Sequence, residues 1–192
     1  MKVRIGTRKS KLALAQTEMF ANALKKRFDD IDTEIVCIST KGDKILDKPL
    51  AMIGGKGVFI SELENALLSG AADMAVHSAK DLPLELAYGL EISSALNRGN
   101  YRDVLVARKN NPIQNREDFI VGTGSLRRQS FIKKIYPLVC IKDIRGNVDT
   151  RLGKLMNGDY DAIILAAAGL ERLSLYNSAD YDIMPFEYKD FL

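Results

Sequence analysis

The first half of the chain alternates between two hydrophobic periods. Apolar residues recur at helical spacing in two segments, and short β-rich runs precede, separate and follow them. A later run, LEISSAL, predicts one more strand. In chain order the strand-like runs are 2–6, 33–40, 73–76 and 90–96, and the helical segments are 9–28 and 58–70. Strands alternating with helices predict an α/β layer.

The alternation starts again after NRGNYRD, a polar, glycine-bearing passage at 97–103. DVLVAR, IVGTG, LVCIKDI and YDAIILAA predict strands, and the helical segments between and after them are SLRRQSFIKKIY, NVDTRLGKLMNG and AAGLERLSL. We therefore predict two α/β domains, 1–97 and 98–186. Ligand sites in such sheets lie beyond the carboxyl ends of the strands.

Composition narrows the class of protein. An apolar content of 46% in 192 residues supports a sizeable core, and a net charge of +3 does not call for a nucleic acid. No apolar run is long enough to span a bilayer, so we expect a cytoplasmic protein without a membrane partner. Cys37 and Cys140 lie in apolar runs and are expected to be buried, reduced thiols. With one histidine and no paired cysteines, no metal site is expected.

Basic residues recur where a predicted strand ends or a helix begins. Helix N-termini present unpaired N–H groups to an anion, and arginine adds a planar fork that holds a carboxylate by two bonds. Several such cations exceed what one monoanion needs, so we expect a ligand with several negative charges. The cations are Arg8, Lys56, Lys80, Arg127, Arg128, Arg145, Arg151 and Arg172.

Each of these motifs also has an ordinary structural interpretation. GGKG around Lys56 is compatible with a simple turn, and SLRRQ with the solvated start of a helix. RGNVDTR is compatible with a turn capped by Asn147 or Asp149, and Arg172 with a surface ion pair. The recurrence of the set, rather than any one member, favours a binding site.

The stretch VHSAKDLP holds the single histidine and an aspartate in basic company. His77 ends an apolar strand and is expected to be a partly buried support residue. A carboxylate among cations stays ionised, which suits Asp81 to stabilise a positively charged group. The alternative is that Asp81 caps the segment that begins at Leu82.

The chain resembles the hydroxymethylbilane synthase family, also called the porphobilinogen deaminases. Seven segments carry the resemblance, in family order and across nearly the whole chain. They are GTRKSKLALAQT, TKGD, GGKGVFISELE, AVHSAKDLP, GTGSLRRQ, RGNVDTRL and DAIILAAAGLERL.

The resemblance implies two lobes like those of type II periplasmic binding proteins, with the active site in the cleft between them. It also implies a third, α+β domain whose cysteine attaches a dipyrromethane cofactor. The chain stops at MPFEYKDFL, before that domain, and residues 187–192 would begin the return crossover to domain 1. Neither cysteine present stands at the attachment position, so activity of this chain alone is left open.

The implied activity is that of a transferase, which joins four porphobilinogen molecules head to tail and releases ammonia in tetrapyrrole (haem) biosynthesis. Its partners would be porphobilinogen and the growing oligopyrrole, and a monomer is expected. The alternative is a non-catalytic, anion-binding two-lobe module of the periplasmic-binding-protein type.

The resemblance also assigns roles to residues. Asp81 is the implied catalytic residue. The implied cofactor-binding residues are Ser10, Lys80, Asp81, Thr123, Ser125, Arg127, Arg128 and Arg145. The implied substrate-binding residues are Arg8, Gln16, Lys56, Arg145, Arg151 and Arg172. The chain departs from the family at Gly124, where serine is frequent, and at Met52, where lysine is common.

Overall fold

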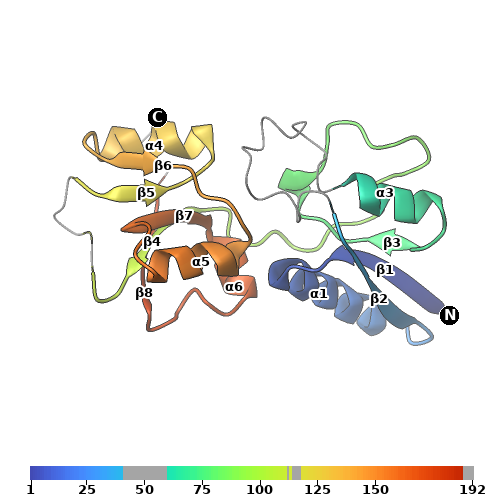
Figure 1. Ribbon diagram of the computed structural model, residues 1–192. Coiled ribbons are helices and arrows are strands. Elements are labelled where there is room, and N and C mark those ends of the chain that lie inside the picture. Colours follow the sequence, from blue (N-terminus) through green and yellow to red (C-terminus); the bar gives the residue numbers. More distant parts are fainter. Residues whose placement is uncertain (41–59, 112, 114–117, 188–192) are drawn as a thin grey trace. The chain divides into compact units, whose positions relative to one another are not determined.

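The computed structural model describes residues 1–40, 60–111, 113 and 118–187 (Figure 1). Lys56 and Met52, and the crossover residues after 187, lie outside the described part. The chain divides into two compact units, Met1–Asn97 and Arg98–Leu192.

Unit 1 is a parallel sheet with strand order β2-β1-β3. Ile5 pairs with Ile35 on one side and with Met74 on the other. The side chains of Val3, Ile5 and Ala21 form its buried core. Its elements are β1 (Lys2–Arg8), α1 (Lys11–Arg27), β2 (Asp32–Ile38), α3 (Ser61–Leu68), β3 (Met74–Ala75) and the 3-10 helix η2 (Ala79–Asp81).

Helix α1 begins and ends where its sequence predicts. Ser10 is its N-cap, and the Ser10 hydroxyl accepts a hydrogen bond from Ala13 N at 3.2 Å. Three basic residues fill the last turn, where they complement the negative end of the helix dipole. Within the described residues, no helix is both long and apolar enough to cross a membrane.

Unit 2 is a mixed sheet with strand order β6-β5-β7-β4-β8. Strands β5, β6 and β7 are parallel, whereas β4 runs antiparallel to both β7 and β8. The last strand was not predicted from the sequence. The elements are β4 (Asp103–Arg108), β5 (Ile120–Gly122), α4 (Leu126–Ile135), β6 (Cys140–Lys142), α5 (Val148–Met156), β7 (Ala162–Ala166), α6 (Ala167–Arg172) and β8 (Tyr181–Pro185).

Helices cover both faces of the unit 2 sheet. Figure 1 shows α4 on one face and α5 with α6 on the other. Strand β4 divides its side chains accordingly: Val104 and Val106 pack in the cluster that includes Leu155 of α5, and Leu105 packs in the cluster that includes Ile132 of α4. Burial on both faces explains why DVLVAR is a continuous apolar run rather than an alternating one.

Two expectations were wrong. LEISSAL at 90–96 is not a strand: it is irregular in the structure, and all of its residues except the partly buried Leu90 are exposed. A β-rich run becomes a strand only where a neighbouring strand accepts its hydrogen bonds, and the described strands provide none to it. Cys37 and Cys140 are free, as expected, but exposed rather than buried. Cys37 lies on β2 and Cys140 on β6, each the outermost strand on one side of its described sheet.

Candidate functional site

In unit 1, polar residues gather where two neighbouring parallel strands end. Arg8 ends β1, and the segment 77–81 follows β3, which pairs with β1. Gln16 of α1 donates a hydrogen bond from Nε2 to Ser78 Oγ at 2.9 Å, which ties the helix to this segment. The structure therefore brings together Arg8, Ser10, Gln16, His77, Lys80 and Asp81 within one unit.

Two threonines next to this group were not singled out from the sequence. Thr17 of α1 donates to the Thr7 hydroxyl of β1 at 2.7 Å, and both side chains are buried. This bond fixes the start of α1 against the strand that carries Arg8. Threonine is too common on strands and helices for the sequence pattern to have singled out the pair.

Lys80 and Asp81 lie in the short η2 helix, and both are exposed. The Asp81 backbone N–H donates to Ser78 O at 2.9 Å, so the turn itself is fixed. The Asp81 carboxylate makes no hydrogen bond with the described residues, so the alternative role of capping the next segment is not seen. The turn presents this carboxylate to solvent.

His77 is partly buried, as expected of a support residue. Burial is the main cause that lowers the pKa of His77 from its usual 6.5; the Asp81 carboxylate opposes this effect, and the Arg8 charge adds to it. His77 therefore lies within electrostatic reach of the two groups to which roles are assigned.

This arrangement predicts how the single histidine titrates. The pKa of His77, followed by NMR of its ring proton, is expected below 6.5. Asp81→Asn removes a charge that favours the imidazolium and lowers this pKa further, whereas Arg8→Gln raises it. Because the unfolded chain binds the proton more tightly, stability falls as pH drops through 6.5 toward the folded pKa. Identical titration curves in both variants would show that these groups are not neighbours.

In unit 2, the topology gathers four chain segments at one sheet edge. The carboxyl ends of β5, β6 and β7 lead into Thr123, Asp143 and α6. Strand β4 runs the opposite way, and its first residue, Asp103, pairs with Ala166 at the end of β7. Parallel strands leave the sheet at the edge where β4 enters it.

Three arginines meet at this edge. Burial is the main cause that lowers the pKa of Arg151, and the nearby charges of Arg128 and Arg145 add to it. Arg151 Nε donates to Gly146 O at 2.7 Å, which holds the RGN turn against α5. The cluster formed by Arg128, Arg145 and Arg151 is named the arginine cluster below.

The arginine cluster contains N–H groups that the described chain does not satisfy. Arg145 Nη1 and Arg128 Nε are buried and have no hydrogen-bond partner among the described residues. A buried donor without a partner costs about 1–3 kcal/mol. A ligand that supplies oxygen acceptors would recover this free energy.

The two hydroxyl residues of the GTGS loop hold the loop itself. Thr123 is buried, its N–H donates to Lys142 O at 3.0 Å, and its hydroxyl accepts from Ser125 N at 3.3 Å. Ser125 is the N-cap of α4 and accepts from Arg128 N at 3.5 Å. These contacts fix the loop that leads into Arg127 and Arg128.

Two glycines of this loop differ in what surrounds them. A Cβ on Gly122 would lie 2.9 Å from the ring of Tyr160, whose hydroxyl donates to Asp143 O at 2.7 Å. A Cβ on Gly124 would lie 2.5 Å from Asp143 Oδ1, the free end of an exposed side chain. The buried ring cannot move aside, whereas the carboxylate can rotate.

The two alanine variants should therefore differ in stability. We expect Gly122→Ala to lower the free energy of unfolding by about 1–3 kcal/mol, through overpacking against Tyr160. Gly124→Ala should cost less than about 1 kcal/mol, because Asp143 turns away. Urea unfolding of both variants measures this difference. Equal losses would mean that Asp143 is held as firmly as Tyr160.

Arg172, the last residue of α6, lies against the backbone at the start of unit 2. Its Nη2 is 3.3 Å from the place where a Cβ on Gly99 would stand. The neighbouring Glu171 accepts a hydrogen bond from Asn100 Nδ2 at 2.9 Å. The described contacts of Arg172 are thus with this segment rather than with the arginine cluster.

One acidic residue of this edge, Asp103, was not singled out from the sequence. Its carboxylate accepts hydrogen bonds from Arg127 Nη2 and Arg128 Nη2, each at 2.7 Å. As the first residue of an apolar strand it has the pattern of an ordinary strand boundary. Only the topology could identify Asp103, because its position at this edge depends on β4 running antiparallel to β7.

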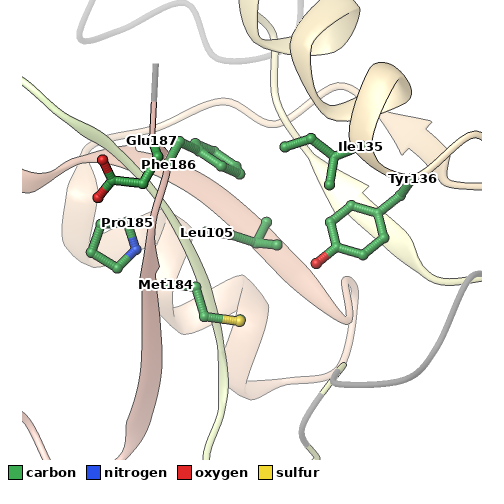
Figure 2. Close-up of a pocket in the computed structure, with 7 residues that line it drawn as sticks. All are labelled: Leu105, Ile135, Tyr136, Met184, Pro185, Phe186 and Glu187. Atoms are coloured by element: carbon green, nitrogen blue, oxygen red, sulfur yellow. The ribbon is translucent and has the colours of Figure 1, made fainter. Parts of the chain in front are cut away.

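Unit 2 also has an apolar cavity of about 200 Å³, at the C-terminal end of α4. Figure 2 shows that most of its lining is hydrocarbon, with the Glu187 carboxylate and the Tyr136 hydroxyl as polar groups. None of the predicted site residues lines it. Polyanion binding needs hydrogen-bond donors, so the candidate site is the sheet edge that carries the arginine cluster and not this cavity.

The fold agrees with that of periplasmic binding domains. The structure is similar to that of the periplasmic VFT2 domain of BvgS from Bordetella pertussis, with a TM-score of 0.51 and 18% identity over 97% of this chain and 76% of that chain. A double mutant of the same domain gives a TM-score of 0.52 at 16% identity. The chain is thus a two-unit α/β protein whose fold is similar to that of periplasmic binding domains, with arginines clustered at one sheet edge.

Sequence comparison identifies the family of this chain. A family model described as porphobilinogen deaminase, dipyromethane cofactor binding domain, matches residues 3–191. The chain belongs to the porphobilinogen deaminase family.

Two curated relatives illustrate the match. A porphobilinogen deaminase of Bordetella parapertussis is 49% identical over 175 residues, which are 91% of this chain and 56% of the relative. One of Paraburkholderia phymatum is 48% identical over 172 residues, or 89% and 53%. The chain therefore spans little more than half the length of these relatives.

Proposed function

We propose that this chain forms the cofactor- and substrate-binding part of a hydroxymethylbilane synthase, a transferase that joins four porphobilinogen molecules head to tail with release of ammonia. The observation that carries the proposal is the arginine cluster, with its buried, unpartnered Arg145 Nη1 and Arg128 Nε. Each pyrrole of the oligopyrrole brings two carboxylates, which are the acceptors that these donors lack. Family membership supplies the reaction.

The residues present fit a dipyrromethane, because its carboxylates match the two buried guanidinium N–H groups that have no partner among the described residues, Arg145 Nη1 and Arg128 Nε. The proposal assigns its binding to the residues Ser10, Lys80, Asp81, Thr123, Ser125, Arg127, Arg128 and Arg145. When bound, the dipyrromethane supplies the pyrrole from which the oligopyrrole grows.

Substrate binding is assigned in the proposal to a second set of residues. They are Arg8, Gln16, Lys56, Arg145, Arg151 and Arg172. Bond formation between successive pyrroles needs their carbons held close together, and arginines that bind acetate and propionate groups achieve this orientation. The contacts of Arg172 with the Gly99 segment suit a role at the margin of this set.

Asp81 performs the electrostatic step. The aminomethyl group of porphobilinogen is protonated near neutral pH, as a lysine side chain is, so ammonia leaves without a further acid. The pyrrole that remains carries positive charge. A fixed carboxylate stabilises this charge as it develops, and the exposed Asp81 carboxylate, which has no hydrogen bond to the described residues, is suited to that task.

The test uses this chain joined to the part of the Bordetella parapertussis relative that the match does not cover. Porphobilinogen is added, and ammonia release is followed together with loss of the free pyrrole. Release of one ammonia for each porphobilinogen consumed supports the proposal. Binding of porphobilinogen without ammonia release would instead indicate the non-catalytic, anion-binding module.

A further inference from the structure

Asp103 lies at the sheet edge that carries the arginine cluster because of the direction of β4. It is the first residue of the only strand of the described unit 2 sheet that enters at the edge where β5, β6 and β7 leave. Only 7% of its side chain is exposed. A buried carboxylate is costly unless it is paired, so its partners are informative.

Two consecutive arginines are among those partners. Asp103 Oδ2 accepts from Arg127 Nη2, and Oδ1 accepts from Arg128 Nη2, each at 2.7 Å. Arg128 also donates to Ile164 O at 3.0 Å. The exposed fractions of the two side chains are 63% for Arg127 and 14% for Arg128. One carboxylate thus joins an exposed cation to a buried one.

The position of these arginines on α4 is unfavourable without such a partner. They occupy the first turn of α4, which contains no acidic residue, and cations there oppose the helix dipole. Consecutive residues on a helix also point in different directions and do not face each other. Asp103 draws the two guanidinium groups together in spite of this geometry.

The two arginines also keep the Asp103 carboxylate ionised. Burial alone would raise the pKa of Asp103, but hydrogen bonds and charges from Arg128 and Arg127 outweigh it and lower the pKa below 3.8. The carboxylate is therefore ionised across the neutral range.

We propose that Asp103 is a positioning residue that converges Arg127 and Arg128 on the same carboxylate-bearing ligand. This inference rests on the proposed function only for the identity of that ligand. It concerns how the binding groups are held, and Asp103 itself does not touch the ligand.

The sign of one binding change separates positioning from simple charge compensation. If Asp103 only offset positive charge, Asp103→Asn would tighten the binding of an anion. If Asp103 positions the arginines, the same variant weakens it. We expect Asp103→Asn to weaken binding of propane-1,2,3-tricarboxylate by about tenfold, measured by calorimetry on the whole chain at constant ionic strength.

Two controls exclude a loss of folding as the cause. Asp182→Asn removes another carboxylate of unit 2, one that pairs with Lys109 at 2.8 Å on β8. Ile132→Val removes a buried methyl group from α4 and lowers the melting temperature without changing a charge. Both variants should bind the tricarboxylate as the wild type does.

A double-mutant cycle tests whether Asp103 acts through Arg127. Arg127→Leu alone should weaken binding, and adding Asp103→Asn should cost clearly less than it does alone. Additive losses, or unchanged or tighter binding in Asp103→Asn, would overturn the inference and leave the proposed function standing.

Other outcomes test the proposed function separately from this inference. A wild-type chain that binds the tricarboxylate, and loses it through Asp103→Asn, supports the inference even if the extended protein consumes no porphobilinogen. A wild-type chain that binds the tricarboxylate no better than the uncharged triamide would contradict both.

Discussion

Asp81→Ala is expected to abolish porphobilinogen consumption in the chain joined to the uncovered part of its relative, with a fall in kcat of at least about 100- to 1000-fold. The reason is that the Asp81 carboxylate is the group proposed to stabilise the positive charge left by ammonia. Binding of the tricarboxylate should remain near that of the wild type, because the arginine cluster is untouched. The measurements are ammonia release and calorimetric binding on the same preparation.

Asp73→Asn is the matched control for this variant. Asp73 is another exposed carboxylate of unit 1, and it pairs with Arg4 at 2.7 Å on the same sheet. An exposed ion pair contributes little, so turnover should not change. Near-normal turnover by Asp81→Ala would show that the catalytic assignment is wrong. Equal losses in both variants would indicate a general effect of removing negative charge from unit 1.

Arg145→Met is expected to have opposite effects on binding and on stability. The variant removes a charge-assisted donor, so affinity for the tricarboxylate should fall by about 10- to 100-fold. The same change removes a buried N–H group that has no partner in the described chain. The ligand-free variant should therefore be at least as stable as the wild type, because methionine fills similar space without a desolvation cost. Calorimetry and urea unfolding measure the two effects.

Lys133→Met provides the comparison on α4. Lys133 is an exposed cation in the last turn of that helix, and its removal should leave tricarboxylate binding unchanged. If Arg145→Met were clearly less stable than the wild type, Arg145 would be a structural residue. If both variants lost the same small fraction of affinity, general charge rather than a site would explain the binding.

Much of the fold could be predicted from periodicity. The helix from Lys11 to Arg27 lies within the segment predicted at 9–28, and the apolar run DVLVAR is a strand buried on both faces. LEISSAL failed because strand formation depends on a partner, which a local pattern does not report. Strand β8, with residues such as Tyr181 and Asp182, was missed because its sequence lacks a clean alternation.

The candidate site divides in the same way. Arg145 and Arg151 could be singled out because they follow a strand and begin a helix, and the structure gathers them with Arg128. Asp103 could not be singled out, because its role depends on an antiparallel strand that enters at the same edge. The hydroxyls of Thr123 and Ser125 were expected to face a ligand, but their described contacts hold the loop.

The sequence by itself determined the α/β alternation, the family and the set of cations, because these depend on residue types and their order along the chain. Only the tertiary structure decided which cations meet, which donors stay without partners, and that a buried carboxylate joins two of them. The physical reason is that burial and pairing depend on residues distant in sequence: Asp103 is 24 residues from Arg127 and 25 from Arg128, and the fold alone places them within 2.7 Å.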